Sequence, residues 1–188
     1  ISSPQLVTIF DFEGVFKNAF KLSHKISQII LHENNTLMFH LVNSPGSDMP
    51  SWIITNRNGI TQSTMINTLK RTNIPGLTVM SSPLYLFNNS NHFMEFGIDT
   101  LYYFKDNKKS PYAVFYLDDL KLEPDLLITQ SMVKNKEWLT DKFYPGFIVE
   151  NEEYLFLKLI RGITDGYVCA IFNKRTGSVT FLKENAFM

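Results

Sequence analysis

The chain has 188 residues, of which 44% are hydrophobic and 14% aromatic, with 18 acidic and 18 basic side chains. This composition excludes a disordered chain, and the length suffices for one domain with a sizeable core. The net charge of zero leaves no basic excess to neutralise phosphates, so we expect no nucleic-acid partner. No apolar run approaches the length of a membrane span, so no transmembrane segment is expected.

The first predicted element is a β-hairpin at residues 5–22, which reads QLVTIFDFEGVFKNAFKL. Two strands flank a turn whose Gly14 can adopt a positive φ, as tight turns require. The strand after the turn alternates in polarity. We therefore expect a two-stranded unit at the start of the chain.

Three longer units follow, and each is predicted to be a four-stranded antiparallel meander. Apolar and β-branched segments alternate in each with polar or glycine-containing turns, such as Arg57-Asn58-Gly59, which is a strong hairpin signal. The Pro83 in the second unit argues against a central strand at that point, and the run Lys105–Lys109 predicts a solvated loop. The units span residues 26–66, 77–118 and 146–183.

Residues 119–143 differ from the rest, because they lack alternation. Apolar residues here fall at near-helical spacing, which predicts a short helix or a structured connection laid on the sheet. Trp138 in this segment serves either as a packing residue or as a platform for a ligand.

Regularly spaced meanders favour an all-β fold made of β-propeller blades. We expect residues 1–188 to form a single propeller segment. Strands such as Tyr102–Phe104 and Leu155–Leu157 are apolar at every position, so both of their faces need cover, which stacked blades supply. A β-sandwich or a closed barrel is the alternative. About three blades and a hairpin do not close a propeller, so we expect self-association or further blades.

Few residues suggest chemistry. Asp118 and Asp119 form an adjacent carboxylate pair that could bind Ca²⁺ or act in acid–base catalysis, and the alternative is a solvated turn. His92 and Glu95 would join them if several blades contributed one residue each to a central channel. We therefore take Asp118, Asp119, His92 and Trp138 as candidate binding residues.

Metal and cofactor motifs are missing from the sequence. His32 and His40 could lie on adjacent strands, but two imidazoles alone make a poor zinc site. Cys169 lies in an apolar strand and is expected to behave as a small buried hydrophobe. With no phosphate-binding loop, dinucleotide fingerprint or nucleophile elbow, the sequence predicts neither a cofactor nor a metal.

Four stretches resemble a known family: residues 9–16 (IFDFEGVF), 53–59 (IITNRNG), 99–119 and 154–179. They are similar to six-bladed β-propellers, of the NHL or TolB type, that are abundant in Gram-negative gut anaerobes and often described as lipoproteins of unknown function. The resemblance implies a longer propeller and export to the cell envelope, either to the periplasm or to a lipid anchor at the outer membrane. The family has no agreed catalytic residues. The matching positions are Asp99, Leu101, Tyr102, Phe172, Asn173, Lys174, Thr176 and Gly177.

Two classes of function remain open from the sequence. The first is a non-catalytic binding or scaffold module, whose loops or central channel hold a peptide, a glycan or a protein. The second is a hydrolase or lyase that acts on a glycan or a peptide with carboxylates at the central channel. The lack of catalytic motifs favours the first.

Overall fold

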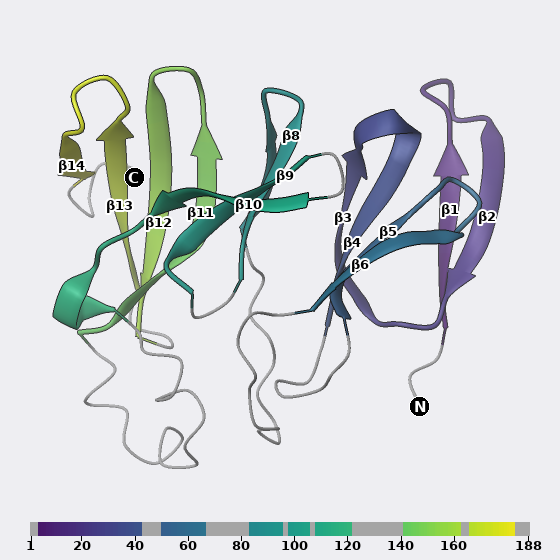
Figure 1. The fold of residues 1–188 in the computed structure, drawn as a ribbon, viewed down its shortest axis with the longest axis horizontal. Helices are drawn as coiled ribbons and strands as arrows, with labels where there is room; N and C mark the ends of the chain where they lie inside the picture. Colours follow the sequence, from purple (N-terminus) through teal and green to yellow (C-terminus); the bar gives the residue numbers. More distant parts are fainter. Residues whose placement is uncertain are drawn as a thin grey trace, which may run out of the picture. The chain divides into compact units, whose positions relative to one another are not determined.

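The computed structural model describes residues 4–42, 50–66, 83–95, 98–105, 108–121, 141–162 and 166–182 (Figure 1). Trp138, residues 77–82 and most of the predicted connection at 119–143 lie outside these ranges. The chain divides into two compact units, residues 1–79 and 80–188.

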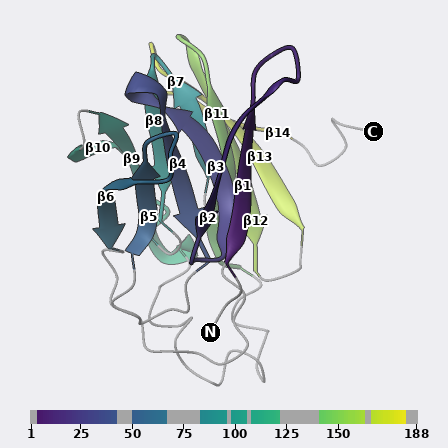
Figure 2. The same ribbon diagram turned by 90° about the vertical axis from the view of Figure 1, so that its right-hand side faces the viewer.

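The first unit contains a two-stranded and a four-stranded antiparallel sheet, whose strands are paired in chain order. Figure 2 shows their strands from the side. A short 3₁₀ turn, η1 (Glu33–Asn35), joins the first two strands of the larger sheet. The strands are β1 (Gln5–Phe10) and β2 (Phe16–Leu22) in the hairpin, then β3 (Ile26–His32), β4 (Thr36–Leu41), β5 (Pro50–Thr55) and β6 (Thr61–Ile66).

The second unit contains two four-stranded antiparallel meanders, again paired in chain order. A 3₁₀ turn, η2 (Asp118–Leu120), follows the first meander. The first strands of the two meanders, β7 and β11, contact each other. The strands are β7 (Leu84–Phe87), β8 (Ser90–Met94), β9 (Thr100–Lys105) and β10 (Lys108–Val114), then β11 (Phe143–Glu150), β12 (Tyr154–Arg161), β13 (Tyr167–Asn173) and β14 (Val179–Leu182).

The structure therefore confirms an all-β fold, and within the described residues it contains a leading hairpin and three four-stranded antiparallel sheets. Pro83 lies just before β7 and not inside it, because proline has no N–H to donate to a neighbouring strand. The closed propeller and the single segment over residues 1–188 stay predictions.

Each unit has a core that alternation in the strands explains. In the first unit, Val7 and Leu22 of the hairpin pack against Phe39, Leu41 and Ile53 of the larger sheet. Because successive side chains of a strand point to opposite faces, every second residue of β1 and β2 reaches this core. In the second unit, both sheets contribute to one cluster, which is formed by Met94, Leu101, Ile148, Leu155, Leu157, Leu159 and Ala170.

Two hairpins of the first unit end in the same turn. Asp11 and Asn56 each accept two backbone N–H bonds through a side-chain oxygen, and each carbonyl accepts the N–H of a glycine three residues later. These glycines, Gly14 and Gly59, have φ values of 80° and 79°. The positive φ explains why glycine occupies both positions, as the sequence predicted for Gly14.

We predict that Gly59→Ala destabilises the protein more than Gly14→Ala does. Both substitutions place a side chain at positive φ, which costs about 1–2 kcal/mol. A methyl group at Gly14 meets open space, whereas one at Gly59 collides with the ring of Phe20. Urea unfolding of both variants measures the difference, and equal losses of stability would contradict the packing of Phe20 on this turn.

Candidate functional site

The candidate site is a buried carboxylate between the two sheets of the second unit. Glu150 is the last residue of β11, and its side chain is fully buried. Strand alternation explains its direction, because Ile148 two positions earlier is 1% exposed whereas Val149 between them faces outward. Glu150 therefore points to the core side of its sheet.

Four side chains bond this carboxylate. The Tyr85 hydroxyl donates to Oε1 at 2.8 Å, and His92 Nδ1 lies 3.1 Å from the same oxygen. The Tyr112 hydroxyl donates to Oε2 at 3.0 Å, and Lys174 Nζ lies 2.5 Å from that oxygen. Three of the partners come from β7, β8 and β10, and the fourth comes from the turn between β13 and β14. The cluster thus joins two separate sheets.

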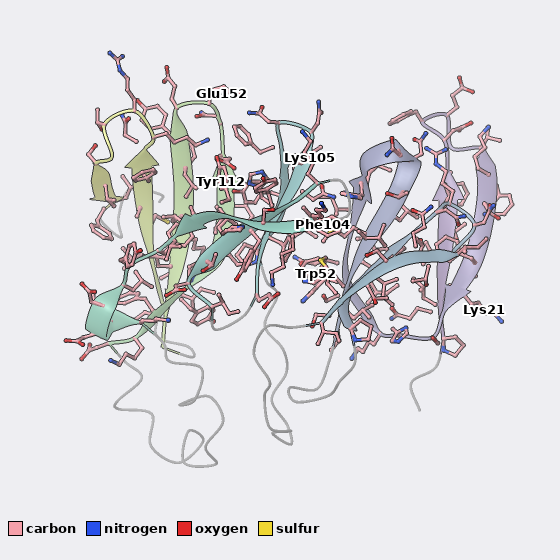
Figure 3. All side chains as sticks on the ribbon, in the orientation of Figure 1. Lys21, Trp52, Phe104, Lys105, Tyr112 and Glu152 are labelled. Carbon is pink, nitrogen blue, oxygen red and sulfur yellow. The ribbon has the colours of Figure 1, made fainter. Side chains whose placement is uncertain are left out.

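Aromatic rings enclose the imidazole of His92, which is 3% exposed. Its centroid lies 5.2 Å from that of Tyr85 and 4.5 Å from that of Tyr112. Lys174 Nζ lies 4.1 Å from the centre of the Phe87 ring and also donates to the carbonyl of Asn151 at 2.6 Å. Figure 3 labels Tyr112 of β10, and Glu152 on the turn after β11.

The surroundings set the protonation of the cluster. Burial alone would raise the pKa of Glu150, but the hydrogen bonds from His92, Lys174, Tyr85 and Tyr112 outweigh it and lower the pKa to about 2. Burial and the bond to Glu150 raise the pKa of Tyr112 to about 12, and burial with the nearby carboxylate charge raises the pKa of Tyr85. At neutral pH, Glu150 is ionised and both phenols keep their protons.

This arrangement limits what the carboxylate can do. Each of its two oxygens already meets two donor groups, which fills the lone-pair directions available to it. A group with a pKa near 2 is a poor base at neutral pH. A buried charge that is fully bonded instead holds its partners together, because losing one of them leaves the charge uncompensated. The geometry is that of a structural clamp between sheets.

A second ion pair, between the buried Glu95 and the half-buried Lys109, corrects one prediction. Lys109 bonds Glu95, which is 4% exposed, and its Nζ also lies 4.0 Å from the centre of the Tyr102 ring. The run Lys105–Lys109 was predicted to be a solvated loop, and this is wrong for Lys109. The sequence could not reveal the error, because Lys109 lies in β10 whereas Glu95 directly follows β8, 14 residues away.

The predicted site residues do not converge. His92 bonds Glu150, and Glu95 bonds Lys109. Asp118 and Asp119 lie on the exposed 3₁₀ turn η2, where the carbonyl of Asp119 accepts a bond from the Lys142 side chain. Trp138 lies outside the described residues. A binding role for these four candidates, Asp118, Asp119, His92 and Trp138, stays a prediction.

The two histidines of the first unit have separate surroundings. His40 Nδ1 lies 2.5 Å from Ser27 Oγ, and its ring packs 4.4 Å from that of Trp52. His32 is at the other end of the strand pair, opposite Thr36. Within the described ranges, no group of three or more His, Cys, Asp or Glu side chains could hold a metal ion. Cys169 is a free thiol and is half-buried, where the sequence predicted a buried one.

Sequence reasoning missed Glu150, Tyr85, Tyr112 and Lys174. The stretch Glu150–Glu153 contains three acids and resembles an exposed turn. The available signal was the alternation that places Glu150 on the same face as Ile148. The partners give no local signal, because Tyr85 and Tyr112 lie 65 and 38 residues away in the chain.

Comparison with known proteins identifies a structural similarity. No family model matches the chain, and neither does any curated protein. The fold is similar to the crystal structure of a "Putative exported protein" from Bacteroides fragilis, with a TM-score of 0.68 and 17% sequence identity. The match covers 94% of this chain and 51% of the other, so this chain spans about half of that protein's length. At this identity the similarity establishes the fold.

Within the described part of the chain, no helix has the length and apolar composition needed to cross a membrane.

We predict that Glu150→Gln removes an acid-sensitive part of the stability. The pKa of Glu150 is lowered on folding, so its contribution is fully present above the unfolded value of 4.5 and is lost as the pH falls toward 2. The shift corresponds to about 3 kcal/mol. Urea unfolding of the wild type should show this loss between pH 5 and pH 2, and Glu150→Gln should lack it.

Glu152→Gln is the matched control, because Glu152 is an exposed acid two residues away. It should keep the pH dependence of the wild type. The clamp would be refuted by a Glu150→Gln variant as stable as the wild type at pH 7.

We also predict that Tyr85→Phe destabilises the second unit by about 1–3 kcal/mol, because one donor to a buried charge is lost. Tyr116→Phe is the control, because Tyr116 is 85% exposed and is not among the donors to Glu150, so this variant should unfold like the wild type. Thermal unfolding compares the two. The account fails if Tyr85→Phe leaves the pH dependence and the melting temperature unchanged.

Proposed function

We propose that this chain is a non-catalytic binding or scaffold segment of a β-propeller of the bacterial cell envelope. Its ligand would be a peptide, a glycan or a protein held by loops or by a central channel. The observation that carries the proposal is the Glu150 cluster, in which the buried charged groups bond one another and join two meanders, so they are not available to a substrate.

The propeller part is supported by the repeated unit. Three meanders of four strands run in chain order, and the first strands of two of them, β7 and β11, contact each other. Adjacent blades of a propeller are arranged around an axis in this manner. The sequence resemblance to six-bladed propellers points the same way.

The envelope location is supported by two observations of different kinds. The sequence resembles propellers that are often described as lipoproteins. The structurally similar protein from Bacteroides fragilis is named as exported. Both observations support the proposed envelope location of this chain.

A binding role is favoured over catalysis by the chemistry of the described acids. Glu150 and Glu95 are buried and already bonded to cations. Asp118 and Asp119 are exposed side by side on a turn, and Glu95 and His92 do not join them. A hydrolase or lyase would need an acid and a base that face one substrate.

Binding of the full chain is tested on a glycan array and on a library of immobilised peptides. Every bound ligand is then analysed by mass spectrometry after prolonged incubation. We expect a ligand that is bound and recovered intact. Cleaved or eliminated product that disappears in Asp118→Asn/Asp119→Asn, but persists in the control Glu152→Gln/Glu153→Gln, would establish the hydrolase or lyase instead. Failure to bind any member of the glycan array or of the peptide library would contradict the binding role.

A further inference from the structure

The hairpin β1–β2 is a half-sheet in a chain whose other sheets have four strands. Within the described residues, β1 pairs with β2 alone, so the backbone on its other side forms a free edge (Figure 1). Two-stranded ribbons are at best marginally stable, and free edges pair readily with other strands. This hairpin therefore lacks about two strands relative to its neighbours.

An open groove lies along this edge. It has a volume of about 480 Å³ and is lined by Gln5–Val7 of β1 and Ile26–Ile29 of β3. Gln5 Oε1 accepts the N–H of Ile26 at 2.7 Å across it. Gln28 Oε1 is buried beside the groove and makes no hydrogen bond within the described residues. The groove thus leaves open space beside the first half of β1, together with an acceptor that makes no hydrogen bond within the described residues.

The sequence of β1 does not protect its edge. Natural edge strands are commonly guarded by charges, prolines or bulges. Another edge strand of this chain, β10, carries Lys108, Lys109 and Pro111. β1 reads QLVTIF, with no charge and no proline, and its one irregularity is a register shift against β2 between Ile9 and Phe10, at its end. Its outward side chains Leu6 and Phe10 are 64% and 56% exposed. Such an edge favours pairing with another strand.

We propose that the free edge of β1 pairs antiparallel with β1 of a second copy of this chain. The two half-sheets then form one four-stranded sheet in the order β2–β1–β1–β2, which matches the size of the other three. Two-fold pairing of this kind is the commonest form of self-association. A second copy also brings the total length to about that of the similar exported protein, of which this chain spans 51%.

Side-chain chemistry selects the register. With the two-fold axis at Thr8, Thr8 lies opposite Thr8 of the other copy, and Leu6 lies opposite Phe10. Threonine pairs and aromatic–aliphatic pairs are favourable across antiparallel strands. Both exposed apolar side chains would be covered, and no like charges would face each other.

The test is light scattering on the full chain over a range of concentrations. We expect twice the monomer mass for the wild type and a twofold lower mass for Thr8→Lys, because two lysines would then face each other at the axis. Ala19→Lys is the matched control, since Ala19 lies opposite Thr8 on β2, is exposed, and lies away from the free edge. It should remain dimeric.

A cross-link keeps the proposal testable if Thr8→Lys fails to fold. In a Cys169→Ser background, Thr8→Cys should give a disulfide-linked dimer under mild oxidation, because directly opposed residues approach closely enough for a disulfide. Ala19→Cys should not. A wild type that is monomeric at every concentration, or a Thr8→Lys variant as dimeric as the wild type, would overturn the proposal and leave the edge to strands of a longer chain or of another protein.

Discussion

The ionised carboxylate of Glu150 is the constraint on which the second unit depends. A fully buried charge is strongly unfavourable unless donors replace the water that it loses. Here donors arrive from four different segments, so the charge is tolerated only when both meanders are folded and in contact. The interaction therefore couples the two sheets more specifically than apolar packing can, because apolar packing has no fixed direction.

Several hairpins of the chain are closed by the same kind of turn. An Asp or Asn at the end of a strand binds the turn backbone, and a glycine with positive φ closes it, at Asp11–Gly14 and at Asn56–Gly59. A longer version occurs at Asn173, which accepts the N–H groups of Arg175 and Thr176. That last turn also carries Lys174 to Glu150. Turn chemistry and the buried charge are thus linked.

The sequence predicted the strands well, because alternation and turn residues are local signals that can be read within one hairpin. It predicted the half-sheet at residues 5–22 and three four-stranded units for the same reason. It could not predict the site. Tyr85, His92 and Glu150 meet only after two sheets pack, so the sequence identified His92 as a candidate binding residue but not its partners. Lys109 was placed in solvent for a similar reason, since its partner Glu95 is not a neighbour in sequence.

The most direct test of the clamp is a measurement of the Glu150 pKa itself. The side-chain carboxyl carbon can be followed by ¹³C NMR during an acid titration, and its signal assigned by its loss in Glu150→Gln. The account predicts a signal that stays at its ionised position through pH 4 and moves only as the pKa of about 2 is approached or the chain unfolds. A titration midpoint at or above 4.5, in a chain that is still folded, would contradict it.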